Sequence, residues 1–377
     1  MTIVVFILVG LLLIYTYILY PFLLKKKAAG KLFAVEKYTA QDDLPDVNII
    51  IPVQNEEQVI AAKLNSILQS SYPKEKIHIY IGLDNCTDST KNIIEQSFSL
   101  PNIHIVEFSE RQGKPSVLNQ LVAGQQFEED ALLIFTDANV LFSATTIFEL
   151  VSCFKDVRVG LVDSNIQPQR ITNENEHLYW NYENQIKFHE SLVYHIIPGP
   201  SGGCFAIRKN LFTPVPSNFL VDDFFIGFSI VIKGYYSLFN PEALCYEDVI
   251  TNWRQEFNRK IRIATGNFQN LWRFKKYAVN PFSTVGFVFI SHKVLRWKTP
   301  FLLLVLYYIL LLECTLFTLM VSLLLPIIDL ILFALGQEFK PLRRFNYFVV
   351  MNMAVFIGFI AFCKGVKSNV WQPTIRS

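Results

Sequence analysis

Residues 135–139 read FTDAN, which places Asp137 and Asn139 one residue apart, directly after an apolar run. Two oxygen ligands at the end of a strand suit a hard divalent cation, Mg²⁺ or Mn²⁺, of the kind often shared with substrate phosphates. Such an ion neutralises a leaving diphosphate by Lewis-acid action. The same residue types also favour turns and helix caps, so both interpretations stay open for this motif alone.

Two further polar residues suit a nucleotide. Asp84, in LDNCTDST, can accept hydrogen bonds from a base or a ribose, or it can cap a helix or form a turn. Lys114, in RQGKP, follows a glycine and can meet a phosphate as a point charge, or it can be a solvated loop lysine.

Asp222 and Asp223 lie between the apolar stretches LV and FFI. Two neighbouring carboxylates in such a setting do not both ionise easily, so one can be a general base with a raised pKa. The alternative is an exposed helix start, where acidic residues favour the helix dipole. Upstream, Gly202 and Gly203 in PGPSGGCFAIR allow the backbone to approach a ligand closely.

Basic residues recur at Arg254, Arg259 and Arg262, across a stretch with helical spacing. Guanidinium groups bind a pyrophosphate bidentately. Cations near a membrane surface also face anionic headgroups, so this series fits either role.

Short apolar strands alternate with helices in the middle of the chain. The predicted strands are residues 47–53, 77–83, 103–108 and 131–136, and the predicted helices are residues 56–69, 88–98 and 116–127. This order indicates an α/β fold with a parallel sheet covered on both faces. Ligands bind such sheets beyond the carboxyl ends of the strands, where Glu56, Asp84 and Asp137 stand.

Several function classes are excluded by what the sequence lacks. It contains neither a GxGxxG nor a GxxxxGK[ST] loop, which argues against a dinucleotide dehydrogenase and a P-loop NTPase. The net charge of +2 gives no electrostatic case for binding nucleic acid. The six cysteines form no CxxC pair, so they indicate neither a zinc site nor a disulfide framework.

The ends of the chain indicate a membrane protein, since 51% of the residues are apolar. Residues 2–24 carry no charge, and a helix of that length crosses a hydrocarbon core of roughly 30 Å. A signal peptide is the alternative, but the positive charge comes after the apolar stretch, at residues 25–27. The positive-inside rule places those lysines in the cytoplasm.

The C-terminal part holds apolar blocks at residues 300–336, interrupted by Glu313 and Asp329, and at residues 345–362. The first block is long for one span and short for two, so three or four spans in total are possible. Residues 281–299 mix apolar and basic side chains, which suits a helix lying in the membrane interface.

Together these motifs resemble the family 2 glycosyltransferases, in particular the membrane-bound branch of poly-N-acetylglucosamine, hyaluronan and cellulose synthases. The resemblance implies a GT-A-type, Rossmann-like fold, with a mostly parallel sheet, helices on both faces and flanking transmembrane helices. The implied parts are an anchor (1–25), a cytosolic glycosyltransferase domain (46–270), an interfacial amphipathic segment (281–299) and a transmembrane region of two or three spans (300–363).

The resemblance also implies roles for single residues. It places Glu56, Asp84 and Lys114 against the nucleotide sugar. It makes Asp223 the catalytic base. It makes Asp137 and Asn139 metal ligands. It also places Asp137, Arg259 and Arg262 on the donor side. The acceptor side is assigned to Gly202, Gly203 and Asp222.

Two departures from the family pattern affect the expected function. Asn139 stands where the second metal aspartate is expected, and it is a weaker, neutral ligand. The processive members carry a Gln-x-x-Arg-Trp motif, of which residues 259–263 (RKIRI) keep only the arginine. This second departure argues against processive polymer synthesis.

We therefore expect an integral protein of the inner or plasma membrane, with a cytosolic catalytic domain that depends on Mg²⁺ or Mn²⁺. It transfers a sugar from a nucleotide-diphosphate donor, by family expectation a UDP-sugar, with inversion. The acceptor is a polysaccharide or oligosaccharide, or alternatively a membrane lipid. A third hypothesis is a catalytically silent, nucleotide-binding membrane partner protein.

Overall fold

The computed structural model describes residues 2–128, 130–169, 174–247, 253–334 and 339–366. The chain divides into two compact units. The sheet unit contains Lys27–Thr251 and Val366–Ser377, and the helical unit contains Met1–Lys26 and Asn252–Gly365. Each unit is described by itself.

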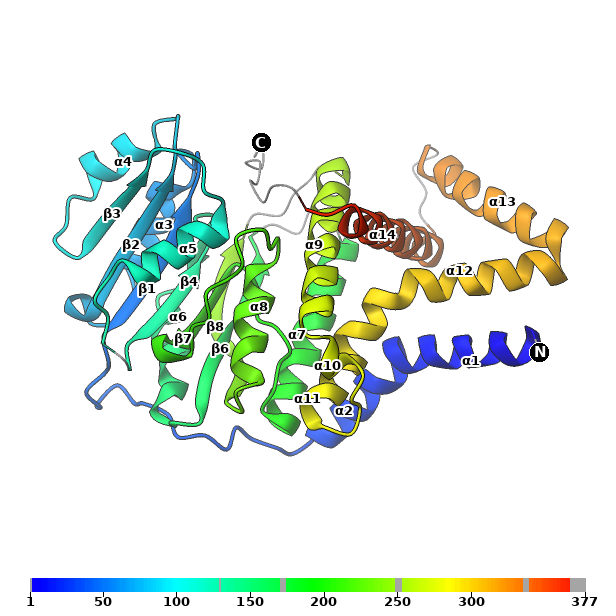
Figure 1. Cartoon of the computed structure of the whole chain (residues 1–377), viewed down its shortest axis with the longest axis horizontal. Coiled ribbons are helices and arrows are strands. Elements are labelled where there is room, and N and C mark those ends of the chain that lie inside the picture. The colour runs from blue at the N-terminus through cyan, green and yellow to red at the C-terminus, as the bar shows by residue number, and fades with distance from the viewer. Residues whose placement is uncertain (1, 129, 170–173, 248–252, 335–338, 367–377) are drawn as a thin grey trace. The chain divides into compact units, whose positions relative to one another are not determined.

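The sheet unit is built on an eight-stranded sheet with the order β3-β2-β1-β4-β7-β6-β8-β5. The first four strands along the chain are β1 (Val47–Val53), β2 (Ile77–Asp84), β3 (Ile103–Phe108) and β4 (Leu132–Thr136). They pair in parallel, as the apolar runs predicted, and form the left part of the sheet in Figure 1. Their carboxyl ends therefore meet at one edge of the sheet.

The other half of the sheet is mixed, and it brings a second chain segment to the end of β4. Its strands are β5 (Val140–Phe142), β6 (Val159–Pro168), β7 (Cys204–Arg208) and β8 (Tyr236–Glu247). β7 runs antiparallel to β4, so that Cys204 pairs with Thr136. Residues 199–203 (GPSGG), called the glycine segment below, come directly before β7. The glycine segment consequently lies beside the FTDAN segment after β4.

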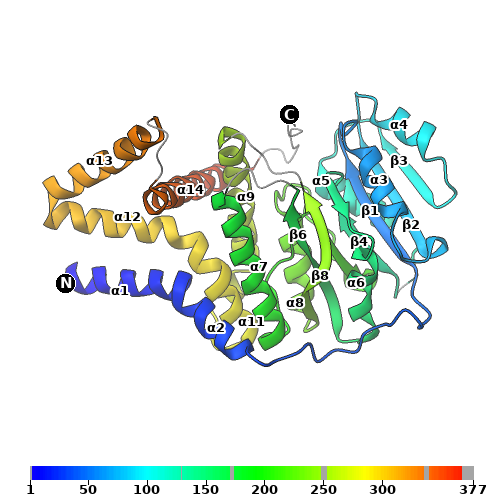
Figure 2. The ribbon, with the colours of Figure 1, turned by 180° about the vertical axis from the view of Figure 1, so that it is seen from behind.

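Helices cover both faces of this sheet. α5 and α8 lie in front of it in Figure 1, whereas α3 lies in front of it in the reverse view of Figure 2. The longer helices of the unit are α3 (Ile60–Leu68), α4 (Thr90–Ser97), α5 (Lys114–Ala123), α6 (Thr146–Ser152), α7 (Glu174–Tyr194) and α8 (Asp222–Val231). Single 3₁₀ turns occur at Lys74–Lys76, Cys153–Lys155 and Lys209–Leu211.

The three predicted helices exist, but each begins at another residue than the predicted one. α4 begins at Thr90 rather than at residue 88. α3 begins at Ile60 rather than at residue 56, because residues 54–59 form the turn that carries Asn55 and Glu56. α5 begins at Lys114 rather than at residue 116, since Pro115 is tolerated in the first helical turn. Every residue of β1 is buried, as expected for a central strand covered on both faces.

The helical unit contains α1 (Thr2–Ile14), a π-helical turn (Tyr15–Leu19) and α2 (Tyr20–Ala28), which reaches the boundary of the unit. Its C-terminal elements are α9 (Trp253–Arg273), α10 (Lys275–Ala278), α11 (Thr284–Phe289), a π-helical turn (Ile290–Val294), α12 (Leu295–Glu313), α13 (Thr315–Ala334) and α14 (Lys340–Cys363).

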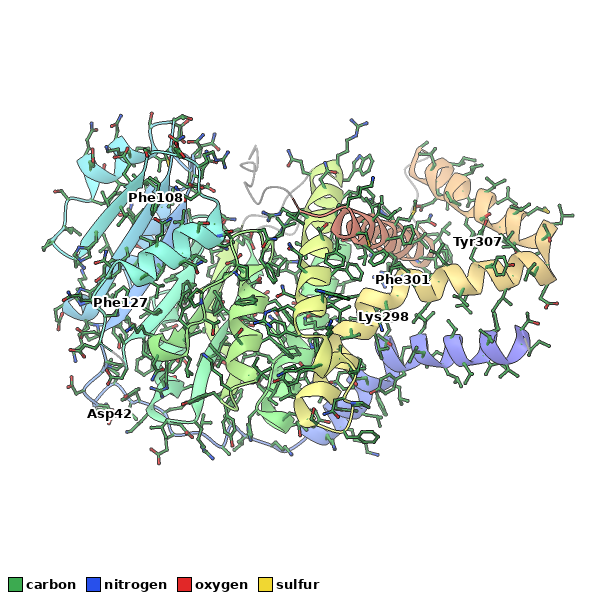
Figure 3. All side chains as sticks on the ribbon, in the orientation of Figure 1. Asp42, Phe108, Phe127, Lys298, Phe301 and Tyr307 are labelled. Atoms are coloured by element: carbon green, nitrogen blue, oxygen red, sulfur yellow. The ribbon has the colours of Figure 1, made fainter. Side chains whose placement is uncertain are left out.

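Four helices among the described residues are long and apolar enough to cross a membrane: Thr2–Ala28, Thr284–Glu313, Thr315–Leu332 and Lys340–Cys363. Large apolar side chains of α1, α12 and α13 are exposed, and Figure 3 shows side chains projecting from these helices. An exposed apolar surface of this extent is typical of contact with lipid.

The segment predicted to lie in the interface, residues 281–299, contains α11, the second π-helical turn and the start of α12. Within the helical unit this segment is tied to the N-terminal helix by two hydrogen bonds. Tyr15 Oη lies 2.8 Å from Ser291 Oγ, and Tyr17 Oη lies 3.0 Å from Thr299 Oγ1.

Candidate active site

A lysine lies between two carboxylates at the centre of the candidate site. Lys114 begins α5, and its Nζ atom lies 2.8 Å from Asp137 Oδ1 and 3.6 Å from Asp222 Oδ2. Burial acts to lower the pKa of Lys114, but the charges of Asp137 and Asp222 outweigh it, and the pKa is raised. Lys114 therefore carries a positive charge at neutral pH and can meet a phosphate.

Asp84, the last residue of β2, holds the loop before Lys114. It is fully buried, and its carboxylate accepts hydrogen bonds from the N–H groups of Gln112, at 2.6 Å, and Gly113, at 3.0 Å. Gly113 has φ +82°, a conformation that glycine adopts at low cost. Asp84 thus positions the start of α5, and its contact with the nucleoside stays a prediction.

The loop after β1 is fixed to the segment after β2. Asn55 has a left-handed backbone with φ 53°, and its Oδ1 accepts a hydrogen bond from the Thr87 N–H at 2.8 Å. The N–H of Glu56 donates to Thr90 Oγ1 at 2.8 Å. Glu56 is half-buried at the sheet edge where the nucleotide is predicted.

The paired carboxylates begin α8, whose residues after Asp223 are all buried. Asp222 is buried and faces Lys114. Burial and the neighbouring charge of Asp222 raise the pKa of Asp223 to about 7. A carboxylate with this pKa can accept a proton from a hydroxyl near neutral pH.

The two predicted acceptor-side glycines stand where a larger residue would collide with its neighbours. A Cβ atom on Gly202 would lie 2.7 Å from Asp223 Oδ2, and one on Gly203 would lie 2.9 Å from side-chain atoms of Val140 and Ile166. The carbonyl oxygen of Gly203 accepts hydrogen bonds from the Asp137 N–H and from Thr136 Oγ1, each at 3.0 Å. The glycine segment is thus held against both Asp137 and Asp223.

Side chains with oxygen atoms that suit a divalent cation lie on the segment after β4 and at the end of β8. Asn139 Nδ2 donates to Glu247 Oε1 at 3.1 Å, which turns the amide and a carboxylate toward each other at the ends of β4 and β8. Asp137, Asn139 and Glu247 fit Mg²⁺ or Mn²⁺, which prefer oxygen ligands and take further ones from phosphates and water. Among the described residues no three His, Cys, Asp or Glu side chains form a closed metal cluster, so such a site would be completed by substrate.

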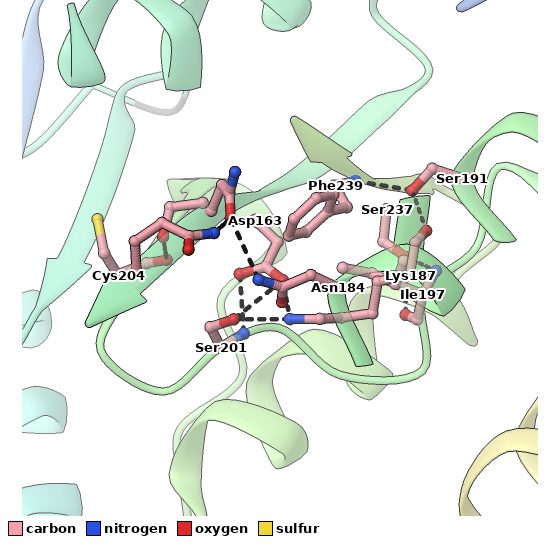
Figure 4. Close-up of polar contacts among 12 residues, drawn as sticks. Asp163, Asn184, Lys187, Ser191, Ile197, Ser201, Cys204, Ser237 and Phe239 are labelled. Atoms are coloured by element: carbon pink, nitrogen blue, oxygen red, sulfur yellow. Dashed lines mark hydrogen bonds and ion pairs between the residues drawn. The ribbon is translucent and has the colours of Figure 1, made fainter. Parts of the chain in front are cut away.

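A buried ion pair between Asp163 and Lys187 holds Ser201 of the glycine segment (Figure 4). Lys187 Nζ lies 2.8 Å from Asp163 Oδ2 and 2.6 Å from Ser201 Oγ, and the N–H of Ser201 donates to Asp163 Oδ1 at 2.8 Å. Burial raises the pKa of Asp163, and the Lys187 charge opposes this shift. The pair fixes Ser201, the residue next to Gly202.

The predicted donor-side arginines stand on a different element. Arg259 and Arg262 lie on α9 of the helical unit, with Arg262 exposed. Their contact with a pyrophosphate stays a prediction.

Three residues of this region were not predicted from the sequence: Glu247, Asp163 and Lys187. Asp163 could have been predicted to be a buried, paired acid, because it interrupts the apolar run VGLVDSNI. A fully buried acid is almost always paired. Glu247 and Lys187 carry no such local signal, since their partners come from strands and loops far along the chain.

Two glycosyltransferase family descriptions match this chain. The family described as Glycosyl transferase family 2 matches residues 48–214, and the family described as Glycosyl transferase family group 2 matches residues 158–359, more than half of the chain. The chain belongs to glycosyl transferase family group 2. It is a glycosyltransferase by this membership, as its motifs predicted.

Curated relatives of this glycosyltransferase are distant. The probable glycosyltransferase YdaM of Bacillus subtilis is 23% identical over 60% of this chain and 56% of its own length. The poly-beta-1,6-N-acetyl-D-glucosamine synthase of Staphylococcus epidermidis is 23% identical over 68% of this chain and 62% of its own length. The glycosyltransferase AglE of Haloferax volcanii is 31% identical over 33% of this chain and 40% of its own length. The chain thus spans less than two thirds of each relative.

A solved structure matches the fold over nearly its whole length. The mannosyltransferase PcManGT from Pyrobaculum calidifontis, in complex with GDP-Man and Mn²⁺, has a TM-score of 0.76 and 21% identity. The match covers 96% of this chain and 99% of that one. The glycosyltransferase therefore has the GT-A fold, which confirms the predicted fold class.

Proposed function

We propose that the chain is a membrane-anchored, inverting glycosyltransferase that takes a sugar from a nucleotide-diphosphate donor. The observation that carries this proposal is the position of Lys114 between Asp137 and Asp222, beside the raised-pKa carboxyl of Asp223. A phosphate-binding cation, a metal-binding carboxylate and a base converge at the carboxyl ends of the strands.

The reaction is a single in-line displacement at the anomeric carbon. Asp223 removes the proton of the acceptor hydroxyl, and Lys114 stabilises negative charge on the leaving diphosphate. Asp137, Asn139 and Glu247 would hold a divalent cation, which supplies Lewis-acid neutralisation of that diphosphate when bound. We propose that Glu56, in the loop after β1, and Asp84, at the end of β2, contact the nucleotide. One displacement inverts the configuration, so a UDP-α-sugar yields a β-linkage.

Two donor classes follow from the similarities. Membership of the family favours a UDP-sugar, and the relative from Staphylococcus epidermidis is a poly-beta-1,6-N-acetyl-D-glucosamine synthase. The similar solved structure holds GDP-Man with Mn²⁺. We propose a UDP-sugar first and a GDP-sugar as the competing donor.

The acceptor is a polysaccharide or an oligosaccharide, and a membrane lipid is the second candidate. The four apolar helices and the incomplete Gln-x-x-Arg-Trp motif favour the lipid candidate. The presence of Asp84 and Asp137 at the ends of β2 and β4, and of Asp223 in the first turn of α8, favours catalysis over a silent nucleotide-binding role.

Nucleotide release by the detergent-purified chain tests the proposal. A panel of UDP- and GDP-sugars is supplied with Mn²⁺ or Mg²⁺, and then with EDTA, in the presence of total membrane lipid and of oligosaccharides. We expect release from one donor that EDTA abolishes. Radiolabelled product extracted into organic solvent identifies a lipid acceptor, whereas product retained in water identifies a glycan. Release that persists in EDTA would contradict the metal assignment.

A further inference from the structure

A lysine is completely buried behind the candidate metal site. Lys63 lies on α3, and its side chain has 0% exposure. Lysine is almost never buried in this way without partners, because removing an ammonium group from water is costly. A Met or Leu at this position would fill a similar volume without that cost, so the contacts of the ammonium group must explain why a lysine stands there.

The ammonium group of Lys63 has three directed contacts. Its Nζ atom donates to Thr136 Oγ1 at 2.8 Å and to the carbonyl oxygen of Val140. It also lies 3.6 Å from the ring centroid of Phe142, a cation–π distance. An ammonium has three protons, so these contacts satisfy the group.

The two hydrogen-bond acceptors bracket the predicted metal ligands. Thr136 comes directly before Asp137, and Val140 comes directly after Asn139. The same Thr136 hydroxyl donates to the Gly203 carbonyl at 3.0 Å, and so does the Asp137 N–H. Lys63 therefore ties both ends of the Asp137–Asn139 segment, and through Thr136 the glycine segment, to one buried point.

We propose that Lys63 is a positioning residue that holds Asp137 and Asn139 in the geometry needed to bind a divalent cation. This inference rests on the proposed function, since it concerns the cation of that same site. Lys63 does not touch the ion or the substrate. It acts through the backbone and hydroxyl groups on either side of the ligands, as outer partners of metal sites do.

The pKa of Lys63 is lowered, as expected when an ammonium group is removed from water. Burial lowers it to about 8, and the neighbouring Cys204, Cys245 and Asp137 oppose this shift. The site therefore retains the charge near neutral pH in spite of its desolvation.

Mn²⁺ binding tests the proposal independently of turnover. Mn²⁺ is titrated into the full-length chain in detergent, once in the presence of UDP and once in the presence of GDP. Electron paramagnetic resonance measures the bound and free Mn²⁺. We expect Lys63→Met to weaken Mn²⁺ binding about 10-fold or more, the lower end of the loss typical for outer partners, while nucleotide binding in EDTA is unchanged. The matched control is Lys74→Met, the same change at an exposed lysine of the sheet unit, and it should bind Mn²⁺ as the natural chain does.

A double-mutant cycle then tests the route through Thr136. Thr136→Val removes the hydroxyl and should weaken Mn²⁺ binding in the same direction as Lys63→Met. If Lys63 acts through this hydroxyl, the effects of the two substitutions are not additive, because the two residues are coupled. The double variant should then bind Mn²⁺ with the same affinity as the single variant that binds it less tightly. Thr136→Val also carries the test should Lys63→Met fail to fold.

The outcomes separate the two proposals. If the natural chain fails to bind Mn²⁺ both in the presence of UDP and in the presence of GDP, the proposed metal-dependent function fails and the inference fails with it. If the natural chain binds Mn²⁺, and folded Lys63→Met and Thr136→Val bind it equally well, the function stands and the role of Lys63 is overturned.

Discussion

At the residue scale, the two carboxylates at the start of α8 differ in their partners. Asp222 faces the ammonium group of Lys114 at 3.6 Å. Asp223 lies against Gly202, and its pKa is raised to about 7 by burial and by the charge of Asp222. Asp222 therefore pairs with Lys114, while Asp223 is suited to accept a proton.

The pH dependence of transfer follows from this raised pKa. Asp223 holds a proton below pH 7 and cannot act as a base there, so kcat/KM should fall about tenfold per pH unit on the acid side and level off above pH 7. Initial rates between about pH 5.5 and 8.5 measure this. Asp223→Asn should lose about 10²-fold to 10⁴-fold in turnover and keep donor binding. Unchanged turnover would refute the base assignment.

The same pKa shift predicts an effect on stability. Because the folded-state pKa lies above the ordinary value of 3.8, the stability that Asp223 contributes is fully present below pH 3.8 and is lost as the pH rises through about 7. Asp223→Asn should therefore raise the unfolding temperature at about pH 8 more than at about pH 4. Thermal scans in detergent at the two pH values provide the comparison, and equal shifts would contradict it.

Gly202 offers a second test at this scale. In Gly202→Ala the added Cβ would lie 2.7 Å from Asp223 Oδ2, so the carboxyl must move. A displacement of about 1 Å can reduce turnover about 10²-fold, and we expect a loss of that order in kcat. Gly10→Ala is the matched control, because nothing lies within 4 Å of its added Cβ. Equal kcat values for the two variants would count against the assigned place of Asp223.

At the scale of elements, the antiparallel entry of β7 beside β4 assembles the site. It sets Cys204 opposite Thr136 and so brings the glycine segment to the end of β4. The Asp163–Lys187 pair then fixes this segment from β6 and α7 through Ser201. The segment is held by backbone pairing on one side and by a buried ion pair on the other.

Removing one charge of this buried ion pair should destabilise the protein more than removing both charges. Lys187→Met leaves Asp163 buried without its cation, and we expect the free energy of unfolding to fall by about 3–5 kcal/mol. Adding Asp163→Asn removes the orphaned charge, and most of the loss should return. Thermal unfolding of the single and double variants, followed by tryptophan fluorescence, checks this. A double variant less stable than Lys187→Met would refute the pairing argument.

At the scale of the whole molecule, the chain combines a GT-A sheet unit with a helical unit that holds four helices suited to a membrane. Lys25, Lys26 and Lys27 lie at the C-terminal end of the first candidate span, Thr2–Ala28. By the positive-inside rule, we propose that these lysines and the sheet unit lie in the cytoplasm.

Protease protection tests this orientation. Lys74 and Lys91 are lysines of the sheet unit, with Lys74 exposed and Lys91 partly so, and they are sites for trypsin. We expect trypsin to digest the sheet unit in inside-out membrane vesicles and to spare it in right-side-out vesicles. The reverse pattern would place the catalytic unit outside the cytoplasm.

The order of strands and helices along the first half of the sheet could be predicted from the sequence, because it depends on local patterns. VNIIIPV is apolar almost throughout since β1 is covered on both faces. Asp84, Asp137 and Asp223 could be singled out because each interrupts or directly follows an apolar run. The family resemblance added their roles, and the family itself is confirmed.

Only the tertiary structure decided which distant residues meet. Lys63 reads as an ordinary polar position of an amphipathic helix, yet it lies buried against Thr136 and Val140. Glu247 meets Asn139 because β8 pairs with β5, and Lys187 meets Asp163 because α7 packs against β6. Local patterns specify helices and strands, whereas long-range pairing specifies the partners of buried charges.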